Sequence, residues 1–202
     1  TRPARYVENG HVVVKPALSD VENMDFPEIG TLEAFNSDGL RSLLATMKVP
    51  NMIEKTLRYP GHVRHIRALR DSGFFGREEI EVRGRSVRPL DVTSAVLFKH
   101  WRLHEDDDEF TIMRIIVEGE ENGRPKRYTY GLFDRRDRTT GFSSMARTTG
   151  FPATAVARLV LAGKFGRKGV CPPEFVGGDE ASFRAVLAEL ASKNVVYHQT
   201  AA

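Results

Sequence analysis

Cysteine is almost absent from this sequence, because Cys171 is the only one among 202 residues. A single cysteine excludes an internal disulfide framework and any zinc site built from several cysteines. It is also typical of a reducing compartment, so we expect a cytoplasmic protein. A long uncharged apolar run is missing as well, since the longest apolar stretch, residues 154–162, is interrupted by Arg158 and falls short of the ~20 residues that span a bilayer. We therefore expect no membrane association, and the polar residues 1–15 predict no signal peptide.

Neither sign of charge is in large excess. The 30 basic and 27 acidic residues leave a net charge of only +3. They are also interleaved, as in residues 134–138, whereas a nucleic-acid-binding protein more often gathers Lys and Arg on one stripe. We therefore expect no nucleic acid partner. The 41% hydrophobic and 28% charged content is instead typical of a soluble globular protein with a core of its own.

Hairpins and helices follow one another irregularly along the chain. Asn9-Gly10 predicts a tight turn, and residues 119–123 join two longer strand-like segments. The polar residues 16–30 predict a turn-rich connection. Because regular βαβ alternation is missing, we predict one α+β domain over residues 1–202, with a largely antiparallel mixed sheet covered by helices. The strands are expected at residues 5–7, 11–14, 31–36, 53–59, 110–118, 127–134 and 195–198, and the helices at residues 38–47, 61–72, 89–103, 152–161 and 180–192.

The predicted helix at residues 89–103 is rich in apolar side chains at helical spacing. This spacing assigns several of them to the protein core. They are Leu90, Val92, Val96, Leu97 and Trp101.

Two junctions combine an arginine with the start of a predicted helix. At the first, a strand ends at Arg58, and Tyr59-Pro60-Gly61 leads into the helix. Backbone N–H groups at a helix N-terminus favour an anion, and an arginine adds a fork that matches a carboxylate. Together they are suited to bind the carboxylate of an amino acid.

At the second junction, Arg147, Thr148 and Thr149 precede a helix whose first residue is predicted to be Pro152. Judged by spacing alone, ordinary helix capping is the stronger explanation of both junctions, because Pro at the first helical position and Thr before it are common. The polar turn at residues 36–38 has the same two explanations.

Neither a metal site nor a dinucleotide site is predicted. His62 and His65 are three residues apart, and His100 and His104 are four apart, but neither pair lies beside an obvious third ligand. Glycines at positions 163, 166 and 169 follow a predicted helix, whereas a dinucleotide fingerprint follows a strand and opens a helix. Cofactor-binding residues therefore remain unknown.

Three segments together carry a resemblance to a known family. They are residues 30–40 (GTLEAFNSDGL), residues 55–62 (KTLRYPGH) and residues 145–152 (MARTTGFP). In this order and spacing they resemble the C-terminal domain of the saccharopine dehydrogenase family, especially its lysine 6-dehydrogenase-like branch. The likeness covers nearly the whole chain, and three ordered motifs are far more specific than any one of them.

The resemblance implies an oxidoreductase that acts on CH–NH groups, with hydride passing to NAD or NADP. Its substrate would be lysine or a saccharopine-like amino acid. Family members place a Rossmann domain before this one, so we expect the sequence to be part of a longer protein and to be inactive alone. The implied partners are its own Rossmann domain and further copies in a homodimer or larger assembly, for which the hairpin at residues 110–134 is a candidate edge.

Site residues follow from the same resemblance. Arg58 matches a family position that holds the substrate carboxylate, and Tyr59 and Gly61 belong to the same motif. Oxidising an amine requires its neutral form, so a base is needed, and His62 is the candidate. Saccharopine-forming members usually carry an aromatic residue at this position, which favours the lysine 6-dehydrogenase branch.

The remaining candidates are polar contacts around the substrate. Asn36, Ser37 and Asp38 lie where relatives place such contacts, and Arg147, Thr148 and Thr149 would complete the polar wall or face the nicotinamide. The alternative from another functional class is a non-catalytic dimerisation or amino-acid-sensing module.

Overall fold

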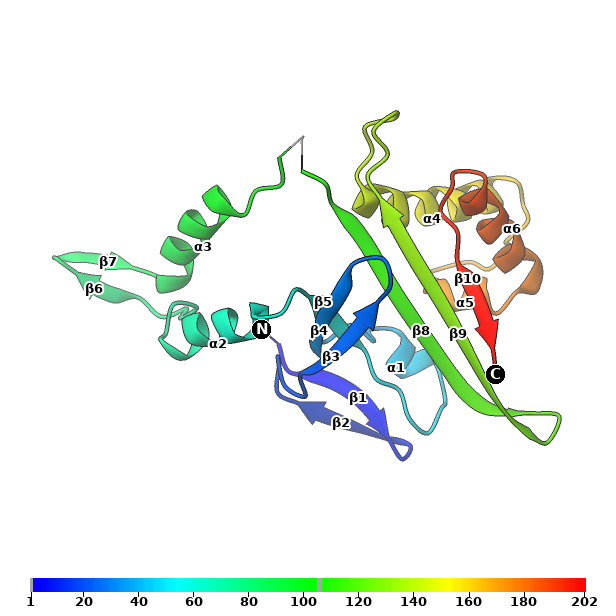
Figure 1. Ribbon diagram of the computed structural model, residues 1–202, viewed down its shortest axis with the longest axis horizontal. Helices are drawn as coiled ribbons and strands as arrows, with labels where there is room; N and C mark the ends of the chain where they lie inside the picture. The colour runs from blue at the N-terminus through cyan, green and yellow to red at the C-terminus, as the bar shows by residue number, and fades with distance from the viewer. Residues whose placement is uncertain (1, 105–106) are drawn as a thin grey trace. The chain divides into compact units, whose positions relative to one another are not determined.

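The computed structural model describes residues 2–104 and 107–202, and these form two compact units with a boundary at residues 104–105 (Figure 1). Helices and antiparallel strands occur in both units, which confirms the predicted α+β class. The described strands form four separate antiparallel sheets in place of one mixed sheet. None of the described helices is long and apolar enough to cross a membrane.

The first unit begins with a hairpin and a three-stranded sheet. Asn9 and Gly10 both adopt left-handed φ angles of 50° and 80°, as a tight two-residue hairpin turn requires. The sheet has the order β3-β4-β5, and its first strand lies inside residues 16–30, which we had predicted to be only a turn-rich connection. The elements are β1 (Ala4–Glu8), β2 (His11–Lys15), β3 (Glu22–Phe26), β4 (Gly30–Asn36), α1 (Leu43–Thr46), β5 (Lys55–Arg58) and α2 (His62–Asp71).

Two small cores stabilise these elements. Tyr6 of β1 is buried with Leu40, and Phe35 of β4 is buried with Leu18 and Val63. Val63 lies on α2, so the helix packs on the face of the sheet that carries Phe35. This packing brings the start of α2 to the middle of β4.

Residues 73–104 form the remainder of the first unit, which we call the arm. It contains β6 (Ile80–Val82), β7 (Arg85–Val87) and α3 (Pro89–His100), and it lies beyond α2, away from the strands β1 to β5 (Figure 1). Two hydrogen bonds join α3 to the start of the arm, from the Leu90 N–H to Gly76 O at 3.0 Å and from Thr93 Oγ1 to Phe74 O at 2.8 Å.

The core assignment for α3 was wrong for several residues. Val92, Val96 and Trp101 are mainly exposed, and Thr93 is the buried residue of the helix. Spacing alone placed these side chains in a core, but the described residues do not cover them.

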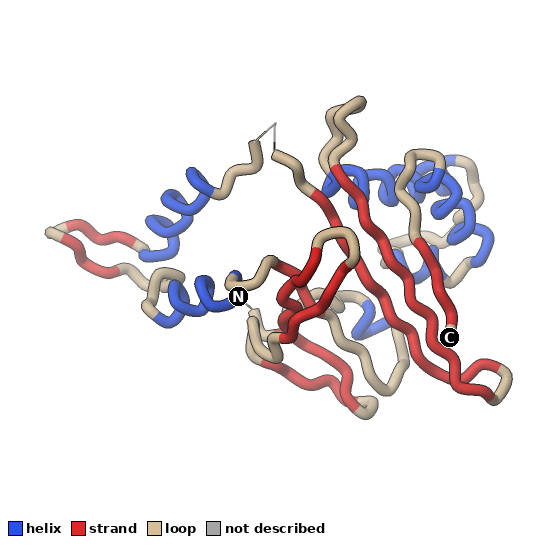
Figure 2. The backbone as a smooth tube through the Cα atoms, in the orientation of Figure 1, coloured by secondary structure: helices blue, strands red, loops and turns tan. Residues whose placement is uncertain are grey.

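The second unit is a three-stranded sheet with helices against it (Figure 2). Its long hairpin is confirmed, and Asn122 and Gly123 form the turn with φ angles of 54° and 74°. Leu132 of the central strand is buried with Leu190 and Val195. The last strand begins at His198, three residues later than predicted, where its pairing with Gly131 of the central strand starts. The elements are β8 (Phe110–Glu121), β9 (Arg124–Arg135), α4 (Ser144–Leu161), α5 (Pro173–Gly177), α6 (Glu180–Ala191) and β10 (His198–Ala201), in the sheet order β10-β9-β8.

Candidate functional site

Glu33 organises the first junction, where β4, β5 and α2 meet. It lies opposite Arg58 in the sheet register. Its carboxylate accepts hydrogen bonds from the Gly61 N–H at 2.9 Å and the Val63 N–H at 3.2 Å, and the Gly61 bond is the main cause that lowers the pKa of Glu33. Two amides at the N-terminus of α2 therefore bind an internal carboxylate, Glu33, where the sequence suggested the carboxylate of an amino acid.

Arg58 is the cation at this junction that remains open to a ligand. Its side chain is exposed, and Nη1 donates to the neighbouring Leu57 carbonyl oxygen at 2.8 Å. No carboxylate of the described residues forms an ion pair with it. Tyr59 lies exposed beside it. The guanidinium fork can therefore accept a carboxylate without breaking a charge pair.

His62 is the first residue of α2, and its side chain is half-buried. Its ring stacks on Phe35 with centroids 5.9 Å apart and an interplanar angle of 11°, so the packing of β4 fixes its orientation. Burial lowers the pKa of His62, and the charge of Arg58 lowers it further. Both effects favour the uncharged imidazole, which is the form that can accept a proton.

Asn36 is held inside the protein at the end of β4. Its side chain is almost fully buried, and Nδ2 donates to Ser19 Oγ at 2.9 Å and to Asp20 Oδ2 at 2.7 Å. These bonds fix the turn at residues 18–20 against β4. A substrate contact by Asn36 remains a prediction.

Ser37 and Asp38 are also tied to other parts of the first unit. Ser37 Oγ donates to the Glu54 carboxylate at 2.7 Å and lies 2.6 Å from Thr56 Oγ1. Asp38 pairs with Arg5 at 3.2 Å, and the hydrogen bond from Arg5 is the main cause that lowers the pKa of Asp38. Neither substrate role is tested by these contacts, and both side chains already have internal partners.

Tyr6 and Glu54 complete this network, and the sequence analysis missed both. The Tyr6 hydroxyl accepts from the Ser37 N–H at 3.0 Å and donates to the Ser37 and Glu54 carbonyl oxygens. Burial raises the pKa of Tyr6 to about 12. The Glu54 side chain lies against the backbone at Gly39. A Cβ at this position would lie 2.4 Å from the Glu54 carboxyl carbon, so only a glycine leaves room for Glu54. Only long-range contacts reveal these two residues, so no local motif could have identified them.

The second junction differs from its prediction. Helix α4 begins at Ser144, with the Ser143 hydroxyl accepting from the Ala146 N–H, and Pro152 lies inside the helix. Arg147, Thr148 and Thr149 are therefore helical residues and do not precede a helix N-terminus. This part of the anion-site prediction is wrong.

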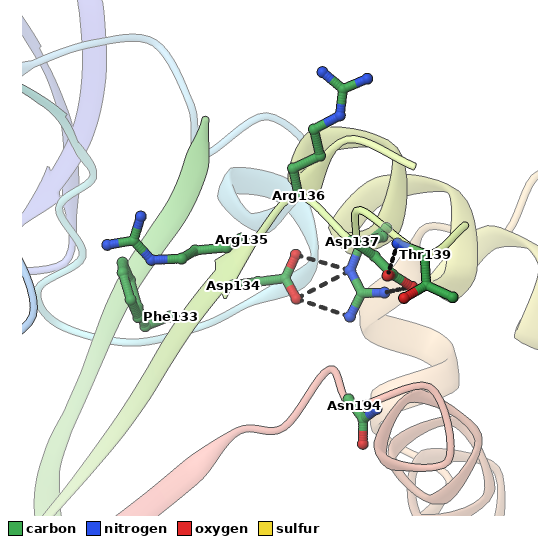
Figure 3. Close-up of a pocket in the computed structure, with 8 residues that line it drawn as sticks. Phe133, Asp134, Arg135, Arg136, Asp137, Thr139 and Asn194 are labelled. Atoms are coloured by element: carbon green, nitrogen blue, oxygen red, sulfur yellow. Dashed lines mark hydrogen bonds and ion pairs between the residues drawn. The ribbon is translucent and has the colours of Figure 1, made fainter. Parts of the chain in front are cut away.

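Arg147 is buried in the second unit. Its guanidinium donates to both Asp134 oxygens at 3.1–3.2 Å, to Asp137 Oδ2 at 3.4 Å and to the Lys193 carbonyl oxygen at 2.9 Å. Figure 3 shows Asp134 and Asp137 converging on this network, whereas Arg135 points away from it. The buried charge is satisfied by these partners, so Arg147 has the contacts of a structural residue.

The two threonines have partners within their own helix, and Thr148 Oγ1 also lies 3.5 Å from Thr111 Oγ1 of β8. Thr148 Oγ1 donates to the Ser144 carbonyl oxygen at 2.9 Å, and Thr149 Oγ1 lies 3.5 Å from Met145 Sδ. The structure thus places the candidates in two sets, one in each unit, and it brings Arg58, Tyr59, Gly61 and His62 together at the junction that Glu33 organises.

An open cleft of about 580 Å³ lies beside Arg147 in the second unit. Phe133, Arg135 and Asn194 contribute to its walls. Arg135 pairs with Asp108 at 2.9 Å and lies 5.0 Å from the centre of the Phe133 ring. Asp134 and Asp137 of the lining are paired with Arg147, so these three charges of the cleft already have partners within the protein.

The described residues do not fit a nicotinamide dinucleotide. Their strand pairs are all antiparallel, whereas a dinucleotide-binding βαβ unit requires parallel strands. Gly163 lies directly after α4 and no strand precedes it there. Among the described residues, no group of three or more His, Cys, Asp or Glu could hold a metal ion.

Comparison with known proteins assigns the family. Residues 1–196, which span both units, match the saccharopine dehydrogenase C-terminal domain. The chain belongs to this family. The chain is also similar to carboxyaminopropylagmatine dehydrogenase from Synechocystis sp. The two sequences are 24% identical over 207 residues, and the match covers 98% of this chain and 50% of the relative. The saccharopine dehydrogenase C-terminal domain described here therefore spans about half the length of that relative.

Proposed function

We propose that this chain is the substrate-binding half of an NAD- or NADP-dependent oxidoreductase that acts on the CH–NH group of an amino acid. The family assignment and the dehydrogenase relative support the reaction class. The observation that carries the proposal is an exposed Arg58, without a carboxylate partner among the described residues, close in the chain to His62, whose ring is held against Phe35 and whose pKa is lowered.

Arg58 binds the substrate carboxylate in this proposal. Two parallel N–H···O bonds from its guanidinium fix both the position and the orientation of the amino acid. Glu33 keeps the start of α2 in place, so the helix terminus is a support for the site and not the carboxylate receptor itself.

His62 accepts the proton that the substrate must lose. An ammonium group cannot be oxidised at its carbon until it becomes a neutral amine, and a neutral imidazole near the carboxylate grip can take that proton. Stacking on Phe35 restricts the imidazole to one plane. The nicotinamide, when bound, supplies the hydride acceptor, and we place its binding outside the described residues.

The substrate candidates from the family are lysine and a saccharopine-like amino acid whose nitrogen carries a second carbon chain. The name of the Synechocystis relative favours a third member of the same class, a carboxyalkylated amine. All three types present a carboxylate to Arg58 and differ in what extends beyond the nitrogen.

The test is reduction of NAD or NADP by the gene product that contains this chain. Lysine, saccharopine and carboxyaminopropylagmatine are supplied separately, and reduced nicotinamide is followed by absorbance. Reduction with one of them supports the proposal and identifies the substrate. If none is oxidised but calorimetry detects amino-acid binding, the chain is a sensing module, and if none is bound, the dimerisation alternative gains support.

A further inference from the structure

One face of the antiparallel β4–β5 pair carries Arg58 and the packing surface for His62. Side chains two residues apart on a strand point to the same face, and directly paired residues share a face as well. Arg58 therefore shares a face with its partner Glu33, and two residues along the ladder Thr56 shares that face with its partner Phe35. We call this side of the β4–β5 pair the ladder face.

Glu54 extends the ladder face beyond the end of β5. The Ser37 hydroxyl, which follows β4, donates to the Glu54 carboxylate at 2.7 Å and lies 2.6 Å from Thr56 Oγ1. The three side chains therefore lie together on one side of the pair. The Tyr6 hydroxyl bridges the backbones of Ser37 and Glu54 at this point, so the position of Glu54 is fixed from both strands.

Glu54 is a half-buried carboxylate without a cation. No lysine, arginine or histidine in the described part of the chain forms an ion pair with it. The neighbouring Lys55 pairs with Glu22 at 2.8 Å, and Arg5 pairs with Asp38 at 3.2 Å, so both cations are engaged elsewhere. Because charges withdrawn from water are normally paired, Glu54 is suited to receive a positive charge from a ligand.

The ladder face thus places three groups in a line, with Arg58 at one end, His62 in the middle and Glu54 at the other end. Arg58 and Glu54 are four residues apart on extended chain, so their Cα atoms are about 13 Å apart. The His62 ring stacks on Phe35, whose partner Thr56 lies midway between the two charged residues. A ligand held at both ends therefore passes the imidazole with its middle.

We propose that Glu54 binds a positively charged end of the substrate, and that the substrate is an amino acid whose mid-chain nitrogen carries a second chain ending in a cation. The inference rests on the proposed function, in which Arg58 holds the carboxylate and His62 takes the proton from the reacting nitrogen. Glu54 is then the residue that determines specificity at the far end of the substrate.

The charge of Glu54 separates the substrate candidates. Saccharopine ends in carboxylates beyond its mid-chain nitrogen, and Glu54 repels them. Lysine offers its one side-chain nitrogen either to His62 or to Glu54, but not to both. A purely structural Glu54 would need only an acceptor for the Ser37 hydroxyl, which an uncharged glutamine also supplies.

The first experiment measures ligand affinity for the gene product that contains this chain, by calorimetry and without nicotinamide so that no turnover occurs. The ligands are carboxyaminopropylagmatine, which ends in a guanidinium, its analogue with an uncharged urea in place of the guanidinium, and saccharopine. The guanidinium ligand should bind roughly 10- to 100-fold more tightly than the urea analogue, as expected when a charged hydrogen-bond partner is gained. Saccharopine should bind more weakly than the guanidinium ligand.

Three variants test whether Glu54 causes this preference. Glu54→Gln keeps an acceptor for Ser37 but removes the charge, so the affinity ratio of the guanidinium and urea ligands should fall toward one. Glu28→Gln removes an exposed carboxylate between β3 and β4 of the same unit and should leave the ratio unchanged. Arg58→Ala should weaken both ligands by the same factor, because it acts on the carboxylate end that they share.

Equal affinity of the wild-type protein for the guanidinium and urea ligands overturns the proposal, as does tighter binding of saccharopine or no binding of any of the three. A ratio that persists in folded Glu54→Gln assigns the cation to another group and also overturns it. If this variant does not fold, the wild-type comparison decides alone. A preference that depends on Glu54, without reduction of NAD or NADP by any ligand, supports the cation site and rejects the enzymatic proposal instead.

Discussion

Arg58 is the candidate site residue whose substitution should affect substrate binding without affecting folding. It is exposed and has no carboxylate partner among the described residues, so Arg58→Ala should leave the melting temperature unchanged. We expect kcat/KM of the gene product that contains this chain to fall by the equivalent of roughly 2 to 4 kcal/mol, because a charged hydrogen-bond partner of the substrate is lost. Steady-state kinetics and thermal melting on the same preparations measure both effects.

Two further variants control this prediction. Arg58→Lys should recover only part of the activity, because an ammonium keeps the charge but loses the fork. Arg64→Ala removes an exposed arginine from α2 and should change kcat/KM little. A folded Arg58→Ala protein with near-normal kcat/KM would remove Arg58 from the site.

His62 should make activity depend on pH on the acidic side. Burial and Arg58 lower its pKa from the ordinary 6.5, so the neutral base persists to more acidic pH before protonation abolishes it. In the wild-type protein, kcat/KM should decrease as the pH falls below 6.5. The His62→Gln variant should lose this acidic limb of the pH profile, and its rate should be lower by a factor of roughly 100 to 10,000. An unchanged acidic limb in His62→Gln assigns the base to another residue.

The lowered pKa of His62 also predicts how the free energy of unfolding changes with pH. The unfolded chain binds its proton at His62 at a higher pH than the folded chain does. Stability contributed by neutral His62 is therefore present above pH 6.5 and decreases as the pH falls from 6.5 toward the folded pKa. An NMR titration of His62 measures the pKa of the folded chain, from which the size of this loss of stability follows.

At the scale of elements, helix α4 depends on the buried pair of Arg147 and Asp134. Arg147→Met should leave Asp134 buried without its cation and lower the free energy of unfolding by about 3 to 5 kcal/mol. Arg158→Ala is the matched control on the same helix, because Arg158 is exposed and its pair with Glu189 should contribute less than ~1 kcal/mol. Denaturant unfolding of the chain compares them. Loss of activity in Arg147→Met at unchanged stability would instead restore its predicted substrate role.

Elements were predictable where their signals are local. Asn9-Gly10 and Asn122-Gly123 specify tight turns through their own backbone preferences, so both hairpins were predicted. The start of α4 was not, because Pro152 is a strong local start signal but Ser143 is the residue that caps the helix. The Ser144 N–H also bonds to Glu109, thirty-five residues away, and no local pattern encodes such a contact.

At the scale of the whole molecule, we expect the 202-residue chain not to bind NAD or NADP measurably. Its described strands pair only antiparallel and form no dinucleotide-binding unit. Calorimetric titration of the chain with each nucleotide tests this. Micromolar affinity would mean that the nucleotide is bound by another arrangement and would overturn the assignment of this chain to the substrate side.

The sequence by itself determined the α+β class, the two hairpins and the family, because turn preferences and ordered motifs are written in consecutive residues. The sequence also places Arg58 and His62 in one motif, and their roles in substrate binding and proton transfer stay predictions. Only the tertiary structure decided that Glu33 occupies the start of α2, that Arg147 is buried against Asp134, and that α3 is exposed. These facts depend on which distant residue comes within a few ångströms and on which surfaces remain uncovered, and spacing along the chain specifies neither.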